Sequence, residues 1–206
     1  EWLEAELDTV ATRTADPFEI AEETKTELRE ADKYWKGKTT SELATSYMAP
    51  EAIRAIEHNI FTPGNYFYNG VGHVTVKYWE VLETGFEGIM EKAQKELDNC
   101  NVGDGDYARK SHFLEAVILS CQAVMDYADR YAQLAREMAG QTSDPVRRQE
   151  LLVIAENCSK VPAKGARGFY EACQSFWFVQ QLIQMESSGH SISPGRFDQY
   201  MYPYYK

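Results

Sequence analysis

The feature that most constrains this chain is a long apolar stripe with helical spacing in its second half. The stripe consists of Phe113, Val117, Cys121, Val124, Ala128, Tyr131, Ala135 and Met138, in steps of four and three residues. Side chains at such steps share one face of an α-helix, so the stripe predicts a core-facing helix of about 26 residues, roughly 39 Å long. Gly140 follows the stripe and is expected to end the helix.

The same period recurs along most of the chain. Further helices are predicted over residues 1–13, 20–32 and 78–97, from Pro145 to a point before Pro162, and from near Gly165 to Ile183. No apolar–polar alternation of the kind that marks a half-buried strand extends over five residues. The sequence therefore predicts a mainly α fold.

The charge balance limits the classes of partner. The chain has 21 Lys and Arg against 32 Asp and Glu, a formal net charge of −11. Nucleic-acid binding needs clustered basic side chains that replace phosphate counterions, so no nucleic-acid partner is expected. No apolar run approaches the ~20 residues that cross a bilayer, so no membrane span is expected either.

The cysteines indicate a reducing, cytoplasmic environment. Cys100, Cys121, Cys158 and Cys173 occur singly, without a CxxC or CxxH pair. This spacing argues against a zinc or iron–sulfur site, and we expect no metal in this segment. Free, buried thiols are the simpler interpretation.

Two segments interrupt the helical pattern and carry candidate functional groups. Residues 61–73 contain three glycines, one proline, several aromatic residues and His73, and residues 186–200 contain His190 and Ser191. Histidine is suited to proton transfer near neutral pH, although a structural, hydrogen-bonded role for each imidazole stays open at this point. No G-x-S-x-G turn surrounds Ser191, which argues against a serine hydrolase.

Several motifs resemble known sequences. The run from Gly189 to Tyr205, GHSISPGRFDQYMYPYY, resembles a segment of glycyl radical enzymes of the pyruvate formate-lyase superfamily, and residues 174–178 and 16–38 resemble helices of their N-terminal region. Residues 35–48 and 64–74, WKGKTTSELATSYM and GNYFYNGVGHV, are similar to the coenzyme-B12-independent glycerol and 1,2-propanediol dehydratases.

The resemblance implies a fold and an extent for the segment. Residues 1–206 would be a single segment of the pyruvate formate-lyase-like domain, from the helical N-terminal portion of an α/β barrel with long loops. The regions with the radical glycine and the thiyl cysteine would lie beyond Lys206, so this fragment alone is expected to be inactive.

The resemblance also implies site residues. In the dehydratases, the residues that match Asn65, His73, His190 and Ser191 contact the diol hydroxyls. We expect His73 to be the catalytic acid that protonates the departing C2 hydroxyl, and Asn65, His190 and Ser191 to bind substrate. The glycyl radical of the full-length enzyme would be installed by a radical S-adenosylmethionine activating enzyme.

The implied protein eliminates water from glycerol or 1,2-propanediol to give an aldehyde. Its partners would be a small diol, the activating enzyme and, at full length, a second copy in a homodimer, in the cytoplasm or a bacterial microcompartment. Two alternatives stay open. One is another glycyl radical eliminase, such as choline trimethylamine-lyase or an enzyme like formate acetyltransferase, and the other is a non-catalytic helical interaction module.

Overall fold

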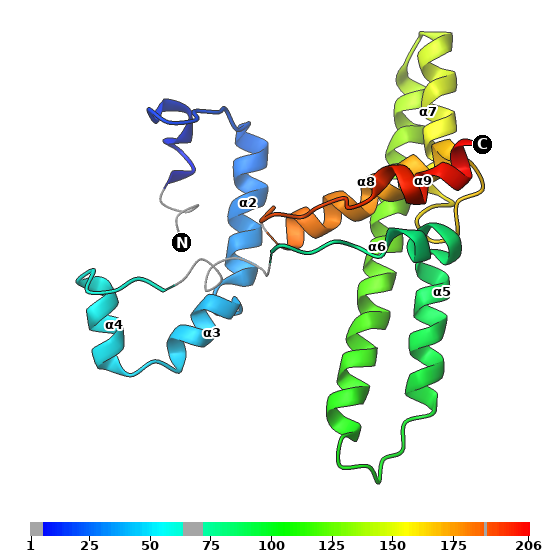
Figure 1. The fold of residues 1–206 in the computed structure, drawn as a ribbon. Coiled ribbons are helices and arrows are strands. Elements are labelled where there is room, and N and C mark those ends of the chain that lie inside the picture. Colours follow the sequence, from blue (N-terminus) through cyan, green and yellow to red (C-terminus); the bar gives the residue numbers. More distant parts are fainter. Residues whose placement is uncertain (1–5, 64–71, 188) are drawn as a thin grey trace. The chain divides into compact units, whose positions relative to one another are not determined.

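The computed structural model describes residues 6–63, 72–187 and 189–206. The chain divides into two compact units, Glu1–Asn69 and Gly70–Lys206. Both are built from helices (Figure 1). The described residues contain no regular strand, only one isolated parallel bridge between Thr75 and Ser193. The prediction of a mainly α fold is confirmed.

Among its described residues, the first unit contains a 3-10 helix and three short α-helices. They are η1 (Val10–Thr12), α2 (Glu22–Trp35), α3 (Thr40–Ser46) and α4 (Pro50–Glu57). A capping box begins α3, because the Thr39 hydroxyl accepts from the Glu42 N–H while the Glu42 carboxylate accepts from the Thr39 N–H. Pro50 occupies the first turn of α4, where its missing N–H costs nothing.

The prediction of a helix through residue 13 is wrong for the described residues. Residues 7–12 form turns and the short η1 instead. The hydroxyls of Thr9 and Thr12 donate to the carbonyl oxygens of Glu6 and Thr9, at 3.2 and 3.0 Å. Such local side-chain bonds compete with the α-helical pattern. The next helix was predicted over residues 20–32 and lies at Glu22–Trp35.

The second unit contains five helices in its described residues. They are α5 (Tyr78–Asp98), α6 (Tyr107–Gln141), α7 (Pro145–Cys158), α8 (Phe169–Glu186) and α9 (Phe197–Tyr205). The long helix α6 runs antiparallel to α5 along one part of its length and to α7 along another (Figure 1). The carboxylate of Asp144 caps α7 by accepting from the N–H groups of Val146 and Arg147.

The predicted apolar stripe of α6 is confirmed in part, since its Cys121, Ala128 and Ala135 are buried. The helix has 35 residues and ends at Gln141, one position past Gly140. Its most buried face carries Leu114, Cys121, Met125, Ala128, Ala132, Ala135 and Ala139. Phe113, Tyr131 and Met138, which the prediction placed in the core, are 66%, 40% and 42% exposed. Alanines allow neighbouring helices to approach closely, so small residues occupy the contact face where the sequence pattern favoured large ones.

One core cluster of the second unit brings α5, α8 and α9 together. Its buried residues are Tyr78, Val81, Leu82, Ala172, Val179, Tyr200 and Met201. The aromatic tail contributes Tyr200 and Met201 from a helix, whereas the sequence indicated an interruption of the helical pattern up to residue 200. This core fixes the start of α5 and the segment that precedes α9.

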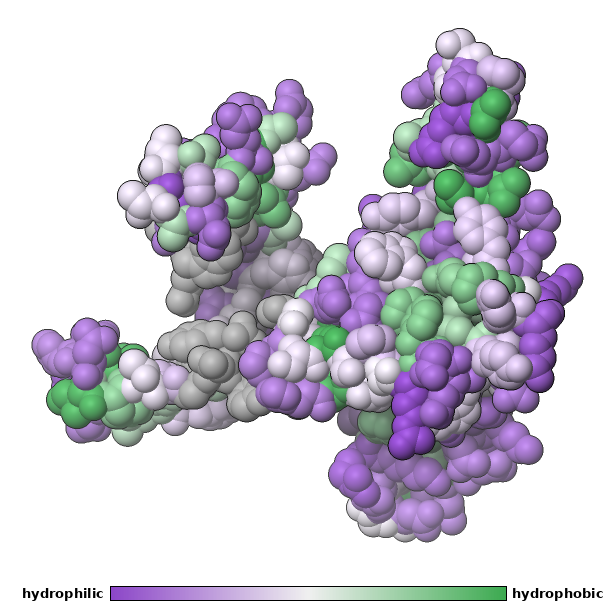
Figure 2. Space-filling model, turned by 45° about the horizontal axis from the view of Figure 1, so that its top comes forward, coloured by the Kyte–Doolittle hydropathy of each residue, from purple (hydrophilic) through white to green (hydrophobic). Residues whose placement is uncertain are grey.

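The second unit also exposes large apolar side chains. Phe113, Leu119, Tyr170, Trp177, Tyr202 and Tyr205 are each more than half exposed. Pale and green residues gather around the middle of this unit in Figure 2, whereas the far end of the α5–α6 hairpin is mainly purple. Exposed apolar surface of this kind is typical of a contact with another polypeptide segment. Among the described residues, no helix has the length and apolarity that crossing a bilayer requires.

Gly85 interrupts α5 with φ +67°. At this break the N–H groups of Phe86 and Glu87 donate to the carbonyl oxygens of Pro162 and Ala163, both at 2.9 Å. A Cβ on Gly85 would overlap the backbone of Ala163 and Lys164. The break therefore joins α5 to the connection between α7 and α8.

We expect Gly85→Ala to lower the free energy of unfolding by at least about 1–3 kcal/mol, the cost of a backbone region that is essentially confined to glycine. The overlap with Ala163 adds to that cost. Gly140→Ala is the matched control, since nothing lies within 4 Å of its added Cβ in α6. That change should stabilise the helix by up to about 1 kcal/mol. Urea unfolding of both variants tests this, and equal midpoints would contradict it.

Candidate functional site

The two segments that interrupt the helical pattern lie side by side. Residues 72–75 precede α5, and residues 190–193 follow α8. The His73 N–H donates to the His190 carbonyl oxygen at 3.3 Å, and the Ser193 N–H donates to the Val74 carbonyl oxygen at 3.1 Å. These bonds and the parallel bridge bring together His73, His190 and Ser191, three of the four residues predicted for the site.

The two imidazole rings are in contact. Their centroids are 5.0 Å apart and their planes meet at 88°, an edge-to-face arrangement. His73 is exposed, and His190 is partly buried. Buried Gly72 makes this approach possible, because a Cβ there would overlap both the ring and the carbonyl oxygen of His190.

Two of the site residues have a strained backbone. His73 has φ +56° and Ser191 has φ +52°, in the left-handed region that favours glycine. Such a conformation costs about 1–2 kcal/mol per residue when a Cβ is present. Strained non-glycine residues cluster at functional sites, where the surrounding contacts hold them. The strain at both positions supports a functional assignment for this pair of segments.

A buried polar pair lies behind the second segment. The Tyr78 hydroxyl donates to Oε1 of Gln180 at 2.6 Å, and Nε2 of Gln180 donates to the Ile192 carbonyl oxygen at 3.1 Å. Burial, with Tyr200 nearby, raises the pKa of Tyr78, so its hydroxyl stays protonated and donates. The sequence interpretation missed both residues. The sequence feature that could have indicated this pair is Gln180 itself, a glutamine inside the most apolar helix of the chain.

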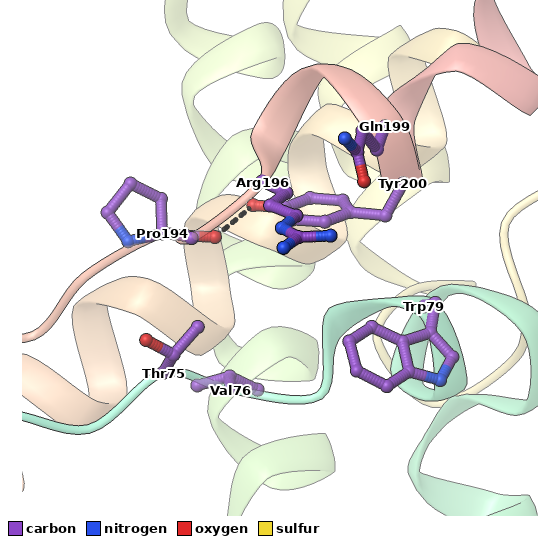
Figure 3. Close-up of a pocket in the computed structure, with 8 residues that line it drawn as sticks. Thr75, Val76, Trp79, Pro194, Arg196, Gln199 and Tyr200 are labelled. Carbon is purple, nitrogen blue, oxygen red and sulfur yellow. Dashed lines mark hydrogen bonds between the residues drawn. The ribbon is translucent and has the colours of Figure 1, made fainter.

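A cleft of about 530 Å³ adjoins the paired segments (Figure 3). It is lined by Thr75, Val76, Trp79, Pro194, Gly195, Arg196, Gln199 and Tyr200. Thr75, Val76 and Trp79 face Pro194, Arg196 and Tyr200 across it. The Tyr200 hydroxyl donates to the Pro194 carbonyl oxygen at 2.7 Å, and burial raises the pKa of Tyr200 to about 12. One wall thus belongs to the residues after His73 and the other to the residues after Ser191.

The cysteines are free thiols, as their spacing indicated. Cys121 and Cys158 are buried in α6 and α7, and Cys173 is partly buried in α8. Burial raises the pKa of the Cys158 thiol to about 11 and also raises the pKa of Cys121 and Cys173. A raised pKa disfavours the reactive thiolate. The described residues contain no cluster of three or more His, Cys, Asp or Glu side chains arranged to hold a metal ion.

Asn65, the fourth predicted site residue, lies outside the described residues. Its role as a substrate contact stays a prediction.

Comparison with known proteins identifies the family. The family model described as pyruvate formate lyase-like matches residues 1–206. The chain belongs to the pyruvate formate-lyase-like family. The resemblance seen in the sequence motifs is therefore confirmed over the whole chain.

Several relatives of this pyruvate formate-lyase-like chain are characterised. A structure from work on 1,2-propanediol dehydration in Roseburia inulinivorans is 67% identical, with a TM-score of 0.82, over 99% of this chain and 26% of that one. The glycerol-bound B12-independent glycerol dehydratase from Clostridium butyricum is 54% identical, with the same TM-score and coverage. The (2S)-3-sulfopropanediol dehydratase of Klebsiella oxytoca is 37% identical over 94% of this chain and 24% of its own length. The chain thus spans about a quarter of the length of these relatives.

We expect Gly72→Ala to separate the two paired segments, because its Cβ would displace His190. The 3.3 Å bond between the His73 N–H and the His190 carbonyl would be lost. A backbone hydrogen bond contributes roughly 1 kcal/mol, so hydrogen exchange at the His73 amide should accelerate about fivefold. Gly105→Ala, whose Cβ meets nothing within 4 Å, should leave that exchange rate unchanged. An unchanged rate in Gly72→Ala would argue against the close approach.

Proposed function

We propose that the full-length protein carrying this chain is a glycyl radical diol dehydratase that removes water from glycerol or 1,2-propanediol to give an aldehyde. One observation carries the proposal. His73, His190 and Ser191 meet on two hydrogen-bonded segments. The chain that carries them is 67% identical to a structure concerned with 1,2-propanediol and 54% identical to one concerned with glycerol. Residues 1–206 would form a single helical segment of the domain and supply substrate contacts.

The chemistry of a diol suits these groups. Two adjacent hydroxyls need several hydrogen-bond donors and acceptors, and two imidazoles and a serine hydroxyl provide both. An orienting bond to a buried hydroxyl discriminates strongly against analogues that lack it. We assign the orientation of the hydroxyls to His190, Ser191 and Asn65.

His73 is assigned as the acid. Hydroxide is a poor leaving group, so a proton donated to the C2 oxygen lowers the barrier to its departure. A ring N–H of His73, in the imidazolium form, would donate that proton. The exposed ring of His73 contacts the ring of His190, so one small substrate could lie against both side chains.

The radical chemistry belongs to other parts of the protein in this proposal. A glycyl radical, installed by a radical S-adenosylmethionine activating enzyme and relayed through a cysteine outside residues 1–206, would supply hydrogen abstraction at C1. The four cysteines of this chain have no part in it, in keeping with the raised pKa of the three in α6, α7 and α8. The full-length protein is proposed to be a homodimer that works in the cytoplasm or a bacterial microcompartment.

The substrate class is tested with the activated full-length protein under anaerobic conditions. We expect propanal from 1,2-propanediol, 3-hydroxypropanal from glycerol, or both, measured with an aldehyde reductase. Choline serves as the competing substrate. Release of trimethylamine without turnover of either diol would replace the dehydratase proposal with that of another eliminase.

The acid assignment is tested with His73→Gln, which keeps a polar side chain of similar size and removes the titrating proton. Turnover should fall by 10²–10⁴-fold, or about 3–5 kcal/mol of barrier. Diol KM should change less, because the amide still forms hydrogen bonds, and the glycyl radical signal in electron paramagnetic resonance should be normal.

The control for this variant is His112→Gln, the same change at an exposed histidine of α6, which should keep normal turnover. Near-normal turnover of His73→Gln with a full radical signal would reject His73 as the acid and point to His190. A joint loss of diol binding and thermal stability would indicate that His73 only supports its loop.

A further inference from the structure

We propose that Gln180 is a positioning residue that sets the geometry of His190 and Ser191 through the backbone, and that Tyr78 holds Gln180 in place. Gln180 bonds to the Ile192 carbonyl oxygen, one residue after Ser191, and Tyr78 bonds to Gln180. The kinetic part of this inference rests on the proposed dehydratase function. Its structural part concerns only the segment at residues 190–193.

One peptide group is held from two sides. The Ile192 carbonyl oxygen accepts from Nε2 of Gln180 on α8, and the Ser193 N–H donates to the Val74 carbonyl oxygen. Both atoms belong to the planar peptide unit that joins Ile192 to Ser193. Two bonds to opposite ends of one plane fix its orientation between α8 and the His73 segment.

Ser191 lies between two anchored peptide groups. On its N-terminal side the His190 carbonyl oxygen accepts from the His73 N–H, and on its C-terminal side the peptide unit of Ile192 and Ser193 is held as described. The positive φ of Ser191 is unfavourable by itself, so these flanking bonds must hold it. Loss of the Gln180 bond would release the C-terminal anchor.

The pair of Tyr78 and Gln180 has the properties of a rigid support. Tyr78 is fully buried and Gln180 is 9% exposed, so water does not compete for the hydrogen bond between them. A buried amide is costly unless it is hydrogen-bonded, and here both its oxygen and its nitrogen are. The Ile192 carbonyl oxygen can only accept, so the N–H₂ end of the amide must face it, which leaves Oε1 to accept from the Tyr78 hydroxyl.

The first test is Gln180→Met in the full-length enzyme, which keeps the side-chain volume and removes both bonds. A misplacement of 1 Å costs about 10²-fold in catalysis, so kcat/KM for the diol should fall by about 10–100-fold, chiefly through KM. The radical signal should be unchanged. Val179→Ala is the matched control, because it creates a cavity in the core from the adjacent position of α8 and leaves the Ile192 bond in place. It should lower the melting temperature and leave KM within about twofold of the parent value.

The second test is Tyr78→Phe, which keeps the aromatic ring in the core and removes only the hydroxyl. This change should raise KM less than Gln180→Met does, by about two- to fivefold, the equivalent of one neutral hydrogen bond. In the Gln180→Met background it should have no further effect on KM, because its influence passes through Gln180. Additive losses would show that the two residues act as independent core contacts and would overturn the proposal.

Hydrogen exchange at the Ser193 amide separates this proposal from the dehydratase proposal. Exchange should accelerate in Gln180→Met and Tyr78→Phe and stay at the parent rate in Val179→Ala. If the parent enzyme leaves both diols unchanged, the proposed function fails while the exchange result still decides whether Gln180 anchors the segment. The role of Gln180 would be overturned if the Ser193 amide of Gln180→Met exchanged at the parent rate. It would also be overturned if the KM of Gln180→Met were as close to the parent value as that of Val179→Ala.

Discussion

The backbone pairing between residues 72–75 and 190–193 is the interaction on which the site depends. Two bonds and one parallel bridge join segments that are far apart in the sequence. Two segments that pair in parallel need a long connection between them, and here α5, α6, α7 and α8 provide it. The helices of the second unit therefore bring residues 190–193 back beside residues 72–75, where the imidazole of His190 contacts that of His73.

The core explains why this meeting point is stable. Tyr78 at the start of α5 stacks on Tyr200 of α9, with ring centroids 5.1 Å apart, and also contacts Phe176 of α8. Tyr78 begins the helix after the first paired segment and Tyr200 lies in the helix after the second. Phe176 lies in the helix that precedes the second segment. Apolar burial thus holds the chain next to each paired segment, whose few hydrogen bonds would be too weak to persist alone.

The sequence predicted the positions of most helices but missed several contacts between residues far apart in the chain. Helical spacing located α5, α7 and α8, because their periodicity reflects one buried face each. It located only part of the buried face of α6, which also includes Ala132 and Ala139. Phe113 and Tyr131 of the predicted stripe are exposed, since apolarity alone does not show which neighbour a helix meets. His73, His190 and Ser191 were found from family motifs. Gln180 and Tyr78 were not, because an isolated glutamine in an apolar helix gains its meaning only from its bonds to two other segments.

In this arrangement the backbone holds the two segments together, which leaves the side chains for other contacts. Main-chain groups of His73, His190 and Ser193 form the bonds that hold the segments, so the exposed side chains of His73 and Ser191 are not required for that purpose. The left-handed backbone at these two residues is the cost of the arrangement, about 1–2 kcal/mol each. Contacts from Gly72, Gln180 and the aromatic core offset that cost. A site built this way keeps its geometry without a bound ligand, so the proposed proton transfer from His73 to a diol hydroxyl would need no further reorganisation of the two segments.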